Sequence, residues 1–224
     1  MRKQETPGRH TEERRQAFLE KGFEMFSQRN IESVRMEDIA LASGHGIASM
    51  YRYFDRKAGF VVEVAAWKWG EFFKENRKRR PSDNFEGKTA ADMFDFYLDS
   101  FLDLYRNQRA LLRFNQFLNV YIQSSEDIAP ETVNSYRQLM KPTADFFHLL
   151  YERGQRDGTI RTDIPETEML STTIHLMLAA VTRYAVGLVY QPPDGFDDLK
   201  ELETLKRMLY QEYATQKFFC GGQP

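Results

Sequence analysis

The sequence of 224 residues predicts an all-α protein in which a small N-terminal domain precedes a larger helical one. Three observations support this fold class. Apolar residues recur at spacings of three and four over most of the chain, as they do on one face of a helix. Alternating apolar and polar residues bounded by turn signals, which are the pattern of a strand, are scarce. Proline, glycine and asparagine stand at the ends of the apolar patterns, where helices start and stop.

The first predicted helix covers residues 11–28, after a polar stretch at 1–10 that is expected to form a flexible arm. Residues at helical spacing form its apolar face: Ala17, Phe18, Gly22, Met25 and Phe26. Asn30 follows this pattern. Because asparagine tolerates the left-handed conformation in which many helices end, Asn30 is expected to provide the C-cap.

Residues 36–57 predict a helix-turn-helix. A short helix over 36–42 is followed by the turn Ser43-Gly44-His45-Gly46 and by a second short helix over 47–54. Met50 and Phe54 lie one helical turn apart and are expected to pack inward. Two short helices joined by a glycine-bearing turn are the layout in which the second helix enters the major groove of DNA. Residues 11–57 are therefore predicted to be a DNA-binding domain.

A connecting helix is predicted over 57–80, and the segment Pro81-Ser82-Asp83-Asn84 then breaks the apolar pattern. Residues 85–220 are predicted to form a regulatory and dimerisation domain. Its expected helices are 88–107, 109–123, 130–157, 165–190 and 198–218. Pro130 and Pro165 suit the first turns of two of these helices, and Gly158 suits the end of another.

Charge is unevenly spread along the chain. Residues 1–80 hold 17 Lys and Arg against 12 Asp and Glu, whereas the remainder holds 14 against 21. The basic first third indicates that the N-terminal part meets a polyanion. The overall composition, 42% hydrophobic and 29% charged, is that of a globular protein rather than a disordered one.

The sequence predicts a cytoplasmic protein with no membrane partner. The single cysteine, Cys220, cannot form an internal disulfide, which fits a reducing compartment. The first ten residues lack the apolar segment of a signal peptide. The most apolar run, 174–190, contains Arg183 and falls short of the roughly 18 uninterrupted apolar residues that a membrane span needs.

The first 80 residues resemble the TetR family of bacterial transcriptional regulators, over roughly 11–72. The matching elements occur together in the family's order and spacing: Met25-Phe26, Asp38-Ile39-Ala40, Ala42 and Gly44, Tyr51-Arg52-Tyr53-Phe54, and Lys57. The resemblance implies a homodimeric, ligand-responsive repressor that binds double-stranded DNA at a pseudo-palindromic operator. An alternative is a helical protein whose degenerate helix-turn-helix mediates protein contacts instead.

The resemblance also implies the DNA contacts. Ile47, Ala48 and Arg52 would face base edges, where Arg52 suits a guanine and the apolar side chains suit a thymine methyl. The phosphate contacts would come from Ser49, Tyr51, Tyr53 and Lys57. Alternative interpretations are that the two tyrosines are packing aromatics, that Arg52 is a phosphate contact or a solvated charge, and that Ile47 is buried.

Three positions depart from the family pattern. Gly46 stands where a serine is common, and it is expected to be the N-cap of the second short helix. Ile47 stands where a lysine or glutamine is common. Arg35 stands where a threonine commonly caps the first short helix, and it is expected to add affinity for the DNA backbone.

Two roles are expected for the larger domain. Helices 165–190 and 198–218 are apolar enough to form a homodimer interface, or else a core within one subunit. The aromatic-rich middle helices are expected to enclose a largely apolar small-molecule effector. The candidate ligand-binding residues, many of which could equally be plain core, are Tyr97, Phe101, Phe117, Tyr121, Phe147, Tyr151 and His175.

No catalytic activity, metal or cofactor is expected. The sequence lacks the common motifs of zinc sites, serine hydrolases and phosphate-binding loops. Four aspartates at spacings of three and four, Asp92, Asp95, Asp99 and Asp103, form an acidic ladder. Because like charges so placed repel each other, the ladder is expected to be a solvated helix face.

Overall fold

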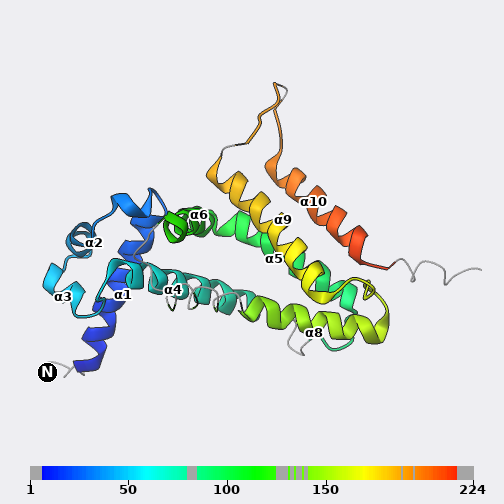
Figure 1. The fold of residues 1–224 in the computed structure, drawn as a ribbon, viewed down its shortest axis with the longest axis horizontal. Helices are drawn as coiled ribbons and strands as arrows, with labels where there is room; N and C mark the ends of the chain where they lie inside the picture. The colour runs from blue at the N-terminus through cyan, green and yellow to red at the C-terminus, as the bar shows by residue number, and fades with distance from the viewer. Residues whose placement is uncertain are drawn as a thin grey trace, which may run out of the picture. The chain divides into compact units, whose positions relative to one another are not determined.

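The computed structural model describes residues 7–79, 85–124, 131, 134, 138, 141–187, 189–193 and 195–215. These residues form helices and no strand, and a single isolated bridge pairs Ile160 with Ala214. The all-α class is thus confirmed. The α-helices, labelled in Figure 1, are α1 (Pro7–Phe26), α2 (Met36–Ala42), α3 (Ile47–Tyr51), α4 (Lys57–Lys78), α5 (Ala90–Asn107), α6 (Arg109–Ser124), α8 (Lys141–Asp157), α9 (Glu166–Val186) and α10 (Asp198–Tyr213). A short 3-10 helix, η1 (Ile31–Ser33), lies between α1 and α2.

The chain divides into two compact units. The first comprises the described residues within 1–72 and 113–139, and the second comprises those within 73–112 and 140–224. Helices α4 and α6 each contribute residues to both units. The break expected at Pro81-Ser82-Asp83-Asn84 lies outside the described residues, as do Pro130 and Cys220.

An aromatic cluster forms the core of the first unit. The rings of Phe54 and Phe60 lie 4.6 Å apart, and Phe18 meets Phe54 edge-on at 6.2 Å. Phe26 contacts Phe60 and, from α6, Phe114. Such pairs stabilise a core by about 0.5–1.5 kcal/mol beyond the area that they bury. The cluster joins α1, the end of the helix-turn-helix and the start of α4.

The start of α1 differs from the prediction. The helix begins at Pro7, so residues 7–10 are helical and not part of an arm, while residues 1–6 lie outside the described residues. Proline favours this first position, because the N–H that it lacks would have no partner there.

The expected left-handed C-cap at Asn30 is wrong. Asn30 has a φ of −54° and a ψ of 132°, and its side chain accepts a hydrogen bond from the Glu32 N–H. It is therefore the N-cap of η1, which is the other position that asparagine favours.

Local hydrogen bonds set the other helix ends. Helix α2 matches the prediction, but α3 ends at Tyr51 because Arg52 N–H bonds to Ser49 O in a tighter turn. Gly187, at a φ of 84°, ends α9 before residue 190. Helix α10 ends at Tyr213, since Ala214 leaves the helix and pairs with Ile160. Gly158, at a φ of 68°, ends α8 as expected.

Helix α5 is the centre of the second unit and packs against α8, α9 and α10. Its first turn is capped by Thr89, whose hydroxyl accepts from Asp92 N–H. Asp157 accepts a hydrogen bond from Ala90 N–H at 2.8 Å, and Thr159 accepts one from Ala91 N–H at 3.0 Å. The end of α8 therefore holds the start of α5.

We expect Gly22→Ala to destabilise the first unit by about 1–3 kcal/mol, the usual cost of overpacking. A Cβ at this position would lie 2.5 Å from the Phe60 ring. The ring cannot yield, because Phe60 is fully buried between Phe26 and Phe54. The free energy of unfolding, measured by urea denaturation, checks the effect.

Gly70→Ala is the matched control for this substitution. Gly70 lies on the exposed side of α4, and nothing comes within 4 Å of an added Cβ. Alanine there should stabilise the helix by up to about 1 kcal/mol. Equal effects of the two substitutions would contradict the close approach of α1 and α4 at Gly22.

Candidate functional site

Helix α3 is positioned by one buried side. The N-cap is Gly46, as predicted, with extended backbone and with its carbonyl accepting from Ser49 and Met50 N–H. Met50 is fully buried, and Phe54, which follows the helix, is almost so. A helix of five residues has little stability of its own, so these two side chains fix its orientation.

The opposite side of α3 faces outward. Ala48 and Arg52 are exposed, whereas Ile47 and Ser49 are half-buried. The Arg52 guanidinium donates to the Ser49 hydroxyl at 3.3 Å, so it lies along the helix. These residue types can meet base edges: guanidinium fits guanine, and methyl groups fit thymine.

The two tyrosines after Met50 have different surroundings. Tyr51 is 47% exposed, and its hydroxyl is available to a phosphate. Tyr53 is half-buried, and its ring lies 5.9 Å from Phe18 and 6.2 Å from Phe54. Tyr53 therefore also packs on the core, in agreement with the alternative interpretation of it as a packing aromatic.

Arg35 stands at the N-cap of α2, and its side chain is exposed. Its backbone N–H donates to the Asp38 carboxylate at 3.3 Å, and its guanidinium lies 3.4 Å from the same group. This side-chain hydrogen bond, with the backbone one, lowers the pKa of Asp38. Asp38 thus satisfies the backbone N–H of the N-cap residue, whereas the Arg35 guanidinium has no acceptor with which to cap the first turn as a threonine does, and its cation stays at the surface.

Lys57, the first residue of α4, is engaged within the first unit. Its ammonium donates to the backbone carbonyl of Glu32 at 3.2 Å and lies 5.8 Å from the centre of the Tyr121 ring. Burial lowers the pKa of Lys57, although Glu32 counteracts this. The Lys57 ammonium, which is expected to contact a phosphate, therefore has two partners within the first unit.

Three of the expected ligand residues come together in the second unit. The Tyr97 ring lies 5.5 Å from Phe101, 5.4 Å from Phe147 and 6.1 Å from Phe146. Tyr97 is 4% exposed, and among the described residues its hydroxyl has no hydrogen-bond partner. Burial raises the pKa of Tyr97, so the phenol stays neutral.

The other four expected ligand residues do not join this cluster. Tyr151 donates its hydroxyl to the carbonyls of Thr162 and Ile164 and so holds the link between α8 and α9. His175 is exposed on α9. Phe117 and Tyr121 lie in the part of α6 that belongs to the first unit.

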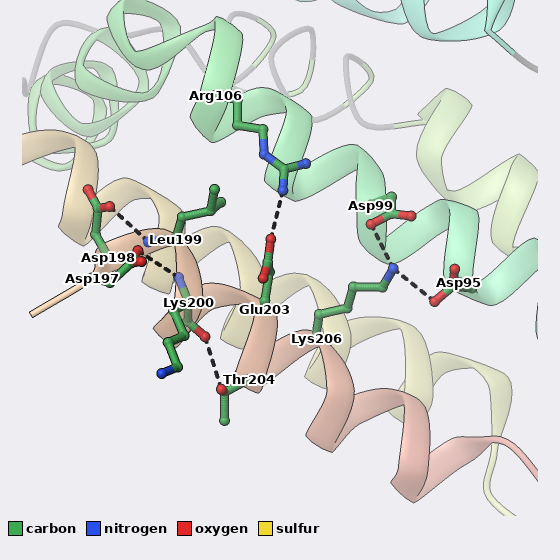
Figure 2. A network of polar contacts seen from close by, with 10 residues as sticks. All are labelled: Asp95, Asp99, Arg106, Asp197, Asp198, Leu199, Lys200, Glu203, Thr204 and Lys206. Carbon is green, nitrogen blue, oxygen red and sulfur yellow. Dashed lines mark hydrogen bonds and ion pairs between the residues drawn. The ribbon is translucent and has the colours of Figure 1, made fainter.

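A groove between α5 and α10 was not predicted. It encloses about 340 Å³, and its lining residues are Asp95, Asp99, Leu102, Arg106, Glu203, Lys206, Arg207 and Tyr210. Figure 2 shows Lys206 reaching from α10 to both aspartates of α5, at 2.9 Å and 2.6 Å, and Arg106 meeting Glu203 at 2.8 Å. Burial would lower the pKa of Lys206, but the two carboxylates outweigh it and raise the pKa.

The acidic ladder is therefore not simply a solvated face. Asp95 and Asp99 share Lys206, Asp103 pairs with Arg79 at 2.6 Å, and Asp92 caps α5. The spacing of the acids places them on one helical face, but only the fold brings cations from other parts of the chain to that face. Across the part of the chain that the structure describes, no group of three His, Cys, Asp or Glu residues is arranged to hold a metal ion.

Among the described residues, helices α9 and α10 each expose a large apolar side chain. Leu176 on α9 is 46% exposed, and Met208 on α10 is 60% exposed. Helix α9 is long and apolar enough to cross a membrane by length and composition alone, and only 33% of its most apolar 18-residue window is buried. Exposed apolar surface of this kind is typical of an interaction site.

Comparison with known proteins gives a match in sequence and several in structure. The sequence model of the tetR family of bacterial regulatory proteins matches residues 18–64. No curated protein matched. A transcriptional regulator from Saccharomonospora viridis, solved with choline, superposes with a TM-score of 0.71 at 16% identity, over 92% of this chain and 100% of that chain.

Two further structures have the same fold. The regulator FadR from Bacillus subtilis, solved with stearoyl-CoA, has a TM-score of 0.67 at 14% identity, over 88% of this chain and 98% of its own. A TetR family protein from Vibrio parahaemolyticus has a TM-score of 0.65 at 13% identity, over 91% and 100%.

Proposed function

We propose that this chain is a DNA-binding transcriptional regulator of the tetR family, and that it acts as a homodimeric repressor released from DNA by a small-molecule effector. The match of residues 18–64 to the family's sequence model and the fold shared with a TetR family protein support this proposal. The outward side of α3 carries the proposal, since Ala48 and Arg52 stand exposed on a helix fixed by Met50 and Phe54. Ile47, Ala48 and Arg52 would contact bases. Arg35, Gly46, Ser49, Tyr51 and Tyr53 would contact the DNA backbone.

The proposed dimer forms through α9 and α10. The uncovered apolar surface of these helices supports it, with Leu176 and Met208 as its most exposed large side chains. A two-fold dimer presents two recognition helices to two half-sites, so the operator would be pseudo-palindromic.

The proposed effector binds in the second unit beside Tyr97. A buried hydroxyl without a partner costs free energy, and a ligand atom that bonded to it would recover that cost. Bound choline and stearoyl-CoA in two proteins of this fold support a small-molecule site. The effector would weaken DNA binding only as far as it prefers the conformation that binds DNA poorly.

Further parts of the proposal concern location and domain limits. The protein would work in the cytoplasm, without catalytic activity and without a cofactor. Residues 11–57 would form the DNA-binding domain, 57–80 the connecting helix, and 85–220 the regulatory domain.

We expect Arg52→Ala to cost roughly 1–3 kcal/mol at one operator position and to relax specificity there, because one bidentate base contact is lost. Selection of bound fragments from random DNA, followed by binding assays on single-base variants, measures this. Arg156→Ala, an exposed arginine on α8, is the control and should change nothing. An equal loss on every sequence would make Arg52 a phosphate contact.

We expect the double variant Leu176→Glu, Met208→Glu to be monomeric, because two charges would be buried in the proposed interface. Light scattering after size-exclusion chromatography gives the mass. Leu149→Glu, a similarly exposed leucine on α8, should leave the dimer intact. A double variant that stays dimeric would place the interface elsewhere.

We expect Tyr97→Phe to stabilise the free protein by about 1–3 kcal/mol, because it removes a buried hydroxyl that lacks a partner. Tyr151→Phe is the matched control and should destabilise the protein by about 1 kcal/mol, because its hydroxyl bonds to two carbonyls. Thermal denaturation measures whether each variant is more or less stable than the wild type. A destabilised Tyr97→Phe variant would mean that the hydroxyl is already satisfied in the free protein.

A further inference from the structure

Two adjacent cations at the start of α4 have opposite surroundings. The Lys57 ammonium is half-buried between the Glu32 carbonyl, at 3.2 Å, and the Tyr121 ring, at 5.8 Å. The Arg56 side chain is 81% exposed, and its Nε lies 3.5 Å from the carboxylate of its neighbour Asp55, which is also exposed. One cation is therefore held by the fold, and the other faces solvent.

The ion pair between Arg56 and Asp55 can readily give way to a contact between Arg56 and a phosphate. An ion pair between two exposed side chains is weak and screened by salt. Guanidinium also matches phosphate geometry, because it can donate two parallel hydrogen bonds. The Lys57 ammonium, in contrast, already contacts a carbonyl and an aromatic ring, so a phosphate would compete with both partners.

Arg56 stands at the head of a long helix within the first unit. Its carbonyl accepts from Phe60 N–H at 3.0 Å, so it directly precedes the first turn of α4. Arg52, which ends α3, is four residues earlier and also exposed. The two arginines and the first-turn N–H groups of α4 together favour an anion beside the recognition helix.

Lys57 ties other parts of the first unit together. The Glu32 carbonyl belongs to η1, which directly precedes α2, and Tyr121 belongs to α6. Arg113, also on α6, donates to the Ser27 carbonyl at 3.4 Å, at the other end of the link between α1 and η1. The segment from Ser27 to Glu32 is thus held from α6 at one end and by Lys57 at the other.

We propose that Arg56, and not Lys57, contacts a DNA phosphate from the start of α4, and that Lys57 is a positioning residue that holds η1 and α2 against α4 and α6. This inference rests on the proposed mode of DNA binding.

The salt dependence of DNA binding separates the two roles. Fluorescence anisotropy with a random-sequence duplex gives log K against log salt concentration, and each phosphate contact contributes about 0.9 to the slope. Arg56→Gln should reduce the magnitude of the slope by about 1. Lys57→Gln should weaken binding at every salt concentration with an unchanged slope, because the charge that it removes does not meet DNA. Arg156→Gln is the control and should match the wild type.

A conservative variant tests the positioning role. Lys57→Arg keeps a cation that can lie over the Tyr121 ring and donate to the Glu32 carbonyl, so it should restore most of the affinity that Lys57→Gln loses. It also serves as the folded comparison if Lys57→Gln does not fold, and its slope should equal that of the wild type.

The outcomes that overturn the inference differ from those that overturn the proposed function. A smaller slope for Lys57→Gln, or an unchanged slope for Arg56→Gln, overturns the inference while DNA binding stands. Wild-type protein that binds no duplex at low salt overturns the proposed function, and the inference with it.

Discussion

The burial of Phe54 between Phe18 and Phe60 is the contact on which the proposed DNA-binding surface depends. Helix α3 has five residues, too few to be stable in water by itself. Met50 and Phe54 anchor it to α1 and α4, and the side opposite to them is left exposed. The proposed recognition surface is thus the outer side of a small aromatic core. Gly22 lets α1 approach Phe60 closely enough for that core to form.

Polar groups in the second unit differ in whether they have partners. Pairs such as Lys206 with Asp95 and Asp99 join α10 to α5 across a polar groove (Figure 2). The Tyr97 cluster, by contrast, is apolar except for one hydroxyl. Charges in the groove pair with each other, whereas among the described residues the buried Tyr97 hydroxyl has no hydrogen-bond partner. The effector proposal follows from that difference.

Residue type alone does not decide the role of a cation. Arg35, Arg52 and Arg56 keep exposed guanidinium groups, although each has a local polar partner. Lys57 carries the same charge, but its flexible stem lets the ammonium turn back onto a carbonyl and a ring. A sequence motif records which residues are basic, whereas the surroundings of each side chain determine which of them can reach a phosphate.

The sequence by itself determined the all-α class, the order of the helices, the limits of α2 and the inward positions of Met50 and Phe54. It did so because helical periodicity, N-caps and glycine turns are local properties of neighbouring residues. Only the tertiary structure decided that Lys57 turns inward, that the acids at 95 and 99 share Lys206, and that Phe117 and Tyr121 belong to the first unit. It also decided that the Tyr97 hydroxyl has no hydrogen-bond partner among the described residues, while the Tyr151 hydroxyl has two. Each of these depends on groups far apart in the chain, whose meeting no local pattern encodes.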